Sequence, residues 1–262
     1  MTHTFMKNEI IYFNGCSYTY GIGINADESA LPAIRFSWTV SNRLGLRDHN
    51  SAKPGSCNMR IFRDSLLEIP SINPKCAVIV WSDPLRTEFD TADSKEFRQA
   101  VKYKWGLMQV RPASVNLLDR RVKRAMDEYY TVLETESRSL LYTMTYMIVI
   151  KNMSESLGIP IIQLPFRHHG WAGLNNVIEN TTNDDLKHQL ITCRDILINE
   201  PNIYGIRNPN DNFIGLSCGE EYLRWLDTVG IRKSEFANHP DKFCHDSFSD
   251  WLVEIIREKG IC

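Results

Sequence analysis

Short apolar runs alternate with amphipathic stretches along the first two thirds of the chain. Residues 10–14, 77–81 and 159–164 have the length and composition of buried strands. Between the first two runs, the spacing of apolar residues predicts helices over residues 31–44 and 58–69. Strands that alternate with helices in this way are typical of a parallel sheet covered on both faces. We therefore expect an α/β fold, a three-layer α/β/α sandwich around a parallel sheet of about five strands.

The second half of the chain is less regular. Residues 116–157 predict a long helical region, and residues 166–231 predict variable loops rich in Asn, Asp and Gly, with one helix near 184–197. These loops would shape a substrate entrance. With no internal repeat or linker, residues 1–262 should form a single domain. The long helical region carries an apolar stripe that should be core, made of Leu133, Leu140, Leu141, Met144, Met147, Ile148 and Leu157. A final helix should bury Phe248, Trp251, Leu252, Ile255 and Ile256.

Composition narrows the classes of partner. The formal charge of −2 gives no electrostatic reason to expect nucleic acid or an anionic membrane surface, so a small-molecule or glycan substrate is favoured. No apolar run reaches the length of a membrane span, and the first nine residues lack the apolar core of a signal peptide. Seven scattered cysteines without a C-x-x-C pair indicate reduced thiols rather than a disulfide framework or a zinc site. We expect a cytoplasmic protein that needs no metal or organic cofactor.

The first candidate for chemistry is the turn that follows residues 10–14. Gly15, Cys16 and Ser17 end that apolar run, and such a turn lifts a serine hydroxyl clear of the sheet. The neighbouring N–H groups then become free to bind an oxyanion. An Asn-Gly sequence followed by a small polar residue also makes ordinary turns, so the segment alone leaves both interpretations open.

Three further segments contain candidate residues. In an open parallel sheet, binding groups gather beyond the carboxyl ends of the strands. Residues 50–56 hold Gly55 just before a predicted helix, where its N–H could meet an anion. Ser82 follows the apolar run 77–81, and His239 precedes the last helix.

Together these segments resemble the four blocks of the SGNH (GDSL-like) hydrolase family. The first block is similar to Gly15-Cys16-Ser17, with Cys16 in the place of the usual Asp, and the second is similar to residues 50–55, with Asn50 and Ala52 in step. Ser82 stands where the third block has Asn, and His239-Pro240 matches the end of the last block. The resemblance covers residues 9–90 and 236–258 and implies an SGNH-hydrolase-like, flavodoxin-like topology. The site residues it implies are Ser17 as nucleophile, His239 as base, and an oxyanion hole of Ser17, Gly55 and Ser82.

The acid that orients the histidine in this family has no counterpart at the expected position. Phe236 stands there, three residues before His239, and a phenyl ring cannot hold an imidazole by a hydrogen bond. Glu235 and Asp241 are the alternatives within reach along the chain, and a backbone carbonyl in a Ser-His dyad is another.

Several further polar residues have structural interpretations. Asp83 could cap a following helix, and Arg86 and Glu88 favour an ion pair or a pocket wall over chemistry. His245 lies inside the last helix and favours packing. The adjacent His168 and His169 follow the run 159–164, which would put them at the same edge of the sheet as the candidate residues. Two neighbouring side chains of an extended segment point apart, which argues against a shared metal.

The resemblance implies a serine esterase or acyl-ester hydrolase acting on a small-molecule or glycan O-acyl ester. Two alternatives stay open. One is an acyltransferase that uses the same site, because the first half-reaction is shared. The other is a binding or structural protein with a decayed site, since Cys16, Ser82 and Phe236 all depart from the pattern and similar chains are common in phage genomes. The acyl group, the alcohol and the oligomeric state are left open.

Overall fold

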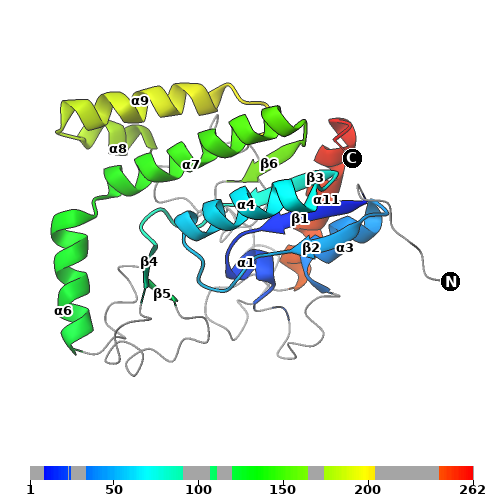
Figure 1. Cartoon of the computed structure of the whole chain (residues 1–262), viewed down its shortest axis with the longest axis horizontal. Coiled ribbons are helices and arrows are strands. Elements are labelled where there is room, and N and C mark those ends of the chain that lie inside the picture. Colours follow the sequence, from blue (N-terminus) through cyan, green and yellow to red (C-terminus); the bar gives the residue numbers. More distant parts are fainter. Residues whose placement is uncertain are drawn as a thin grey trace.

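A four-stranded parallel sheet forms the centre of the molecule, seen in a computed structural model (Figure 1). Its strands are β1 (Ile10–Asn14), β2 (Arg47–Asn50), β3 (Cys76–Val80) and β6 (Ile161–Leu164), in the order β2-β1-β3-β6. All neighbouring strands are parallel, so their carboxyl ends lie at one edge of the sheet. The structure describes residues 9–22, 24, 34–90, 107–110, 120–164, 174–203 and 242–261.

Within the described ranges of the chain, the sheet expected to have about five strands has four. Beyond β6, a single parallel bridge joins Gln163 to Ile203, and the Gln163 N–H donates to the Asn202 carbonyl at 2.9 Å. This bridge occupies the place of a fifth strand in the flavodoxin-like order 2-1-3-4-5, but it is too short to count as one. The α/β fold and the parallel sheet are confirmed.

Strand β2 is one of the elements that the apolar pattern did not predict. Its sequence is Arg-Asp-His-Asn, which contains no apolar residue. It lies at the edge of the sheet and pairs in register with β1, from Ile10–Arg47 to Phe13–Asn50. Pairing with a buried neighbour, rather than its own hydrophobicity, makes this segment a strand.

Helices cover both faces of the sheet. On one face α4 (Asn58–Ile72) and α7 (Glu136–Leu157) pack on the strands, and α9 (Asp184–Ile198) packs on α7 beside α8 (Leu174–Asn180). On the other face lie α3 (Phe36–Arg43) and α11 (Lys242–Glu258). Alternating strand residues divide between the two cores: Tyr12, Ala77 and Ile79 face α4 and α7, whereas Ile11, Phe13 and Val78 face α3 and α11. This is the expected three-layer sandwich.

The region expected as one long helix is divided. It contains α6 (Arg120–Glu128), a π-helical segment η2 (Tyr129–Leu133) and α7. Thr135 is extended and caps α7, because its hydroxyl accepts the Arg138 N–H at 3.2 Å. Gly158 ends α7 in a left-handed conformation. A small antiparallel pair, β4 (Thr87–Asp90) with β5 (Leu107–Val110), stands apart from the main sheet.

The expected apolar stripe is core only at its centre. Leu140, Met144 and Met147 are fully buried, but Leu133 is 56% exposed and Leu157 is 43% exposed. Leu133 belongs to the π-helical segment before the cap of α7, so it does not continue the face of that helix. In α11 the expectation holds, because its apolar residues lie in or against the core: Phe248, Trp251, Leu252, Ile255 and Ile256.

The cysteines differ from expectation at one position. Cys16, Cys57 and Cys193 are free thiols, but Cys76 at the start of β3 is disulfide-bonded. The expectation that all seven are reduced is therefore wrong for Cys76, since spacing along a chain cannot reveal which thiols meet in the fold. Among the described helices, none combines the length and the hydropathy that a bilayer crossing requires.

Candidate active site

Three turns meet at the carboxyl edge of the sheet, each following one of the adjacent strands β2, β1 and β3. The Ser51 N–H donates to the Phe13 carbonyl at 2.9 Å, which lays the β2–α4 loop along the end of β1. The Lys53 N–H reaches the Gly15 carbonyl at 3.4 Å. The parallel register thus brings the segments that hold Ser17, Gly55 and Ser82 to one edge, as expected.

The turn after β1 is held by the side chain of Asn14. Its Oδ1 accepts the Gly15 N–H at 2.8 Å, and its Nδ2 donates to the Ile61 carbonyl at 3.1 Å and to Ser65 Oγ at 2.9 Å. Asn14 is 2% exposed, so these bonds form in a desolvated environment where unpaired groups would be costly. The side chain therefore attaches the turn to α4.

The turn after β1 leaves no space for a side chain at Gly15. A Cβ at this position would lie 2.2 Å from Thr19 Oγ1 and 3.0 Å from the carbonyl oxygen of Val80. The chain can therefore turn tightly against the end of β3 only if this residue lacks a side chain.

Ser17 begins the short helix α1 (Ser17–Tyr20) immediately after that turn. It is 8% exposed, and Cys16 before it is fully buried in the core with α3 and α11. Cys16 caps no N–H of α1 with its side chain, so the residue in the place of the family's Asp packs as an apolar side chain. Ser17 is thus held at the start of a helix beside the carboxyl edge, the position that the strand-and-turn pattern predicted.

Asn50 and Gly55 shape the second turn. The Asn50 Nδ2 donates to the Thr19 carbonyl and to Ser37 Oγ, both at 2.8 Å, and its Oδ1 accepts the Ala52 N–H at 2.9 Å. Asn50 therefore links the end of β2 to α1 and to the first turn of α3. Gly55 has a φ of +82°, a left-handed backbone that favours glycine and frees the loop to approach α4.

Ser82 lies in the third turn and is fully buried. Within the part of the chain that the structure describes, its Oγ has no hydrogen-bond partner. Its backbone is fully paired by Asn58, whose Oδ1 accepts the Ser82 N–H at 2.6 Å and whose Nδ2 donates to the Ser82 carbonyl at 3.0 Å. The remaining polar group, the hydroxyl, is a desolvated donor without an acceptor.

Asn58 itself was missed by the sequence analysis. As the first residue of α4 it has the sequence signature of an ordinary helix start. Its contact with Ser82 joins residues 24 positions apart, and only the fold brings them together.

The residues after Ser82 have structural roles. Asp83 Oδ1 accepts the Leu85 N–H at 2.9 Å, which forms a turn into β4, so the expectation that Asp83 caps a helix is wrong. Arg86 donates to the Ser56 carbonyl at 3.2 Å and thereby ties this turn to the Gly55 loop. Glu88 forms an ion pair with Arg63 at 3.0 Å, rather than with Arg86.

His239, Glu235 and Asp241 lie outside the described residues, as do His168 and His169. The neighbouring helix α11, however, is described from Lys242. Its first turns lie beside the start of α3, since the Phe36 N–H donates to His245 Nδ1 at 3.3 Å.

His245 is fully buried, and its ring stacks on Phe36 with centroids 5.7 Å apart. This is the packing role that its position in the last helix predicted.

The buried thiol of Cys57, just before α4, is poorly suited to act as a nucleophile. Burial raises the pKa of Cys57 to about 11, and the negative charge of Glu88 adds to that effect. At neutral pH the thiol stays protonated, and the thiolate is the reactive form. Among the described residues, no group of three His, Cys, Asp or Glu side chains could hold a metal ion.

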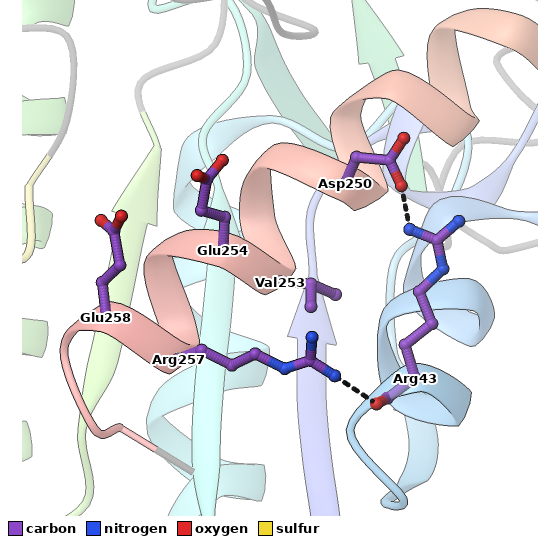
Figure 2. Close-up of a pocket in the computed structure, with 6 residues that line it drawn as sticks. All are labelled: Arg43, Asp250, Val253, Glu254, Arg257 and Glu258. Carbon is purple, nitrogen blue, oxygen red and sulfur yellow. Dashed lines mark hydrogen bonds and ion pairs between the residues drawn. The ribbon is translucent and has the colours of Figure 1, made fainter.

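An open surface pocket lies at the opposite edge of the sheet. It has a volume of about 490 Å³ and lies between α3 and α11 (Figure 2). Arg43 is the last residue of α3, shortly before β2 starts, so this pocket is at the amino edge. Figure 2 shows Asp250 paired with Arg43, and Arg257 donating to the Arg43 carbonyl. None of the residues predicted for catalysis lines it.

Comparisons with known proteins gave structural similarities only. No family model matches the chain, and no curated protein does. A catalytic mutant of the acetylxylan esterase Axe2 from Geobacillus stearothermophilus is 14% identical, with 95% of this chain and 94% of that chain covered and a TM-score of 0.45. The lipase/acylhydrolase from Enterococcus faecalis is 11% identical, with 96% of each chain covered and a TM-score of 0.44.

A lipolytic protein assigned to the G-D-S-L family, from Desulfitobacterium hafniense DCB-2, is 9% identical, with 95% and 99% covered and a TM-score of 0.43. Identities and TM-scores this low assign neither a residue nor a substrate to this chain.

Proposed function

We propose that the protein is a serine esterase or acyl-ester hydrolase with Ser17 as nucleophile and His239 as base. The observation that carries the proposal is the meeting of three turns at the carboxyl edge, one with Ser17 at a helix start and one with a buried Ser82 hydroxyl without a described partner. A buried donor without an acceptor costs free energy, and a substrate oxygen would satisfy it.

The described helices support the placement of the base. Asn50 joins the α1 carbonyl of Thr19 to Ser37 in the first turn of α3, and the Phe36 N–H of the same turn joins His245 in α11. The start of α11 is therefore connected to α1 through two short links. His239 stands three residues before Lys242, a stretch that spans at most about 10 Å. We propose that this short stretch lets the imidazole of His239 reach the Ser17 turn.

In the proposed reaction, Ser17 Oγ attacks the ester carbonyl carbon while His239 takes the hydroxyl proton. The carbonyl oxygen becomes negative and accepts hydrogen bonds from the Ser17 and Gly55 N–H groups and the Ser82 hydroxyl. The tetrahedral intermediate collapses as the C–O bond breaks, and His239 gives its proton to the leaving alcohol. Water then attacks the acyl-enzyme with His239 again as base, which releases the acid and restores Ser17.

Glu235 and Asp241 are the proposed candidates for orienting His239. A carboxylate beside the imidazole would fix its tautomer and stabilise the imidazolium that forms. If neither contributes, the pair would act as a dyad oriented by a backbone carbonyl.

The proposed substrate is a small-molecule or glycan O-acyl ester. An acceptor hydroxyl that replaces water in the second step would make the protein an acyltransferase, and product analysis with and without an alcohol acceptor separates the two.

The test is covalent labelling with a fluorophosphonate probe together with hydrolysis of a short aryl ester. We expect the probe to label Ser17, and Ser17→Ala to lower kcat/KM by about 10⁴-fold or more, because the nucleophile is removed. Ser41→Ala is the matched control, because Ser41 is a buried serine of α3 whose hydroxyl donates to the Ser37 carbonyl at 2.8 Å. Absence of labelling together with unchanged turnover in Ser17→Ala would instead favour a binding protein with a decayed site.

A further inference from the structure

We propose that Asn58 is a positioning residue that holds the Ser82 hydroxyl in the oxyanion hole. This inference rests on the proposed function and identifies a side chain that the sequence pattern did not include. The contact joins the start of α4 to the turn after β3, so two of the three turns at the carboxyl edge are connected by one amide.

Both side-chain N–H groups of Asn58 are used by described partners. Its Nδ2 carries two N–H groups, which donate to the Ser82 carbonyl at 3.0 Å and to Thr143 Oγ1 at 2.9 Å. Its Oδ1 accepts the Ser82 N–H at 2.6 Å. The side-chain amide of Asn58 has no N–H left for a substrate, so this side chain would act on the reaction through Ser82.

The pair of bonds to Ser82 fixes the peptide groups on both sides of its Cα. One side chain binds both the N–H and the carbonyl of the same residue, and Asn58 is 3% exposed, so water does not compete with these bonds. Thr143 on α7 holds the amide from the other side and donates its own hydroxyl to the Ser139 carbonyl at 3.0 Å. Ser82 is therefore anchored to two helices through Asn58, while its Oγ has no described partner.

Such anchoring matters more for a serine than for an asparagine. A serine hydroxyl is closer to the backbone than an asparagine amide, so its reach toward an oxyanion depends on where the backbone lies. An oxyanion donor is effective when it is preorganised at about 2.7–3.1 Å from the developing charge. A small displacement of the turn would remove this donor without removing Ser17 or Gly55.

The experiment is a double-mutant cycle of Asn58→Asp and Ser82→Ala, measured as kcat and KM on an aryl ester. Asp keeps the acceptor oxygen but places a second oxygen against the Ser82 carbonyl, which displaces the turn. We expect Ser82→Ala to lower kcat by about 10²-fold and Asn58→Asp by about 10-fold or more, with KM changed less than threefold. The double mutant should equal Ser82→Ala within about twofold, because Asn58 acts through the hydroxyl that is already missing.

Asn183→Ala is the matched control. Asn183 also accepts a backbone N–H at a helix start, from Leu186 at 2.8 Å, but it caps α9, which packs on α7 away from the sheet. It should lower the thermal midpoint and leave kcat unchanged. The proposal would be overturned if the losses of kcat in the two single mutants added up in the double mutant. Additive losses would mean that Asn58→Asp lowers kcat by disturbing the structure in general and not through the Ser82 hydroxyl.

Amide hydrogen exchange of Ser82 separates this inference from the proposed function. Wild-type protein should protect the Ser82 N–H, and Asn58→Ala should raise its exchange rate by about tenfold or more at matched stability. Unchanged exchange would overturn the inference even in an active enzyme. If no variant, wild type included, hydrolyses an ester or reacts with the probe, the proposed function and the positioning role fail, and faster exchange would then show only that Asn58 anchors the turn.

Discussion

The two edges of the parallel sheet differ in how their polar groups are paired. At the carboxyl edge, Asn14, Asn50 and Asn58 bind the backbone of the turns, and the Ser82 hydroxyl has no described partner. At the amino edge, the pocket of Figure 2 contains an ion pair between Arg43 and Asp250 whose side chains are 41% and 65% exposed. The pocket at the amino edge has a volume of about 490 Å³. The carboxyl edge has a desolvated serine hydroxyl on a backbone that Asn58 holds in place.

This comparison shows that the volume of a surface pocket does not by itself indicate where catalysis can take place. Water and salt screen exposed charges, so the groups in the pocket between α3 and α11 interact weakly with one another. Buried donors keep most of their interaction strength, because no solvent competes for them. The carboxyl edge is therefore where a developing negative charge would be stabilised most.

The largest difference between the edges is expected from two glycine substitutions. Gly15→Ala at the carboxyl edge should lower the free energy of unfolding by about 3 kcal/mol, because the new Cβ would overlap Thr19 and the Val80 carbonyl. Gly45→Ala at the amino edge meets no atom within 4 Å and costs about 1 kcal/mol, since only its left-handed φ of +68° is strained.

Urea unfolding of both glycine variants measures these costs, and ester hydrolysis measures their effect on the site. Equal destabilisation would contradict the tight packing of the first turn against β3. We also expect Gly15→Ala to lose activity and Gly45→Ala to keep it.

A smaller effect is expected from the buried thiol of Cys57 at the carboxyl edge. Its pKa is raised by burial from 9.0 to about 11, so as pH rises the unfolded chain loses this proton first. The stabilising contribution is fully present below pH 9 and is lost as pH rises toward 11, by about 2 kcal/mol. Chemical unfolding between pH 8 and 11 should therefore show a flatter decline for Cys57→Ala than for wild type.

Cys193 on α9 is the comparison for the thiol experiment. Its pKa is also raised by burial, but this thiol is only partly buried. Cys193→Ala should change the pH dependence less than Cys57→Ala does. If the free energy of unfolding depended on pH equally in both variants, Cys57 could not be the more strongly desolvated of the two thiols.

The smallest effect is expected at the amino edge itself. Arg43→Ala removes the ion pair with Asp250, and exposed pairs of this kind contribute about 0–1 kcal/mol. The loss should shrink further in 1 M salt, and ester hydrolysis should not change. A fall in kcat/KM of tenfold or more would mean that the pocket of Figure 2 takes part in the reaction, and it would remove the contrast between the two edges.

Elements with a strong apolar period were predictable, and elements formed by pairing were not. Strands β1 and β3, helix α4 and the apolar side of α11 follow the hydrophobic pattern closely. Strand β2 was missed because its polar residues gain their structure from β1, through backbone bonds that any residue can make. The long helical region is interrupted at Thr135, where the hydroxyl accepts the Arg138 N–H and starts α7. The spacing of apolar residues gives no sign of this hydrogen bond.

The sequence by itself determined the class of fold and the order of the candidate residues. Its periodicity distinguishes buried strands from amphipathic helices, and the turns that hold Ser17, Gly55 and Ser82 follow from where those elements end. Only the tertiary structure decided that Asn58 binds Ser82, that Glu88 pairs with Arg63 and that Cys76 is oxidised. The contacts of Asn58 and Glu88 join residues 24 and 25 positions apart in the chain. Hydrogen bonds, ion pairs and disulfides form according to distance in space rather than distance in sequence.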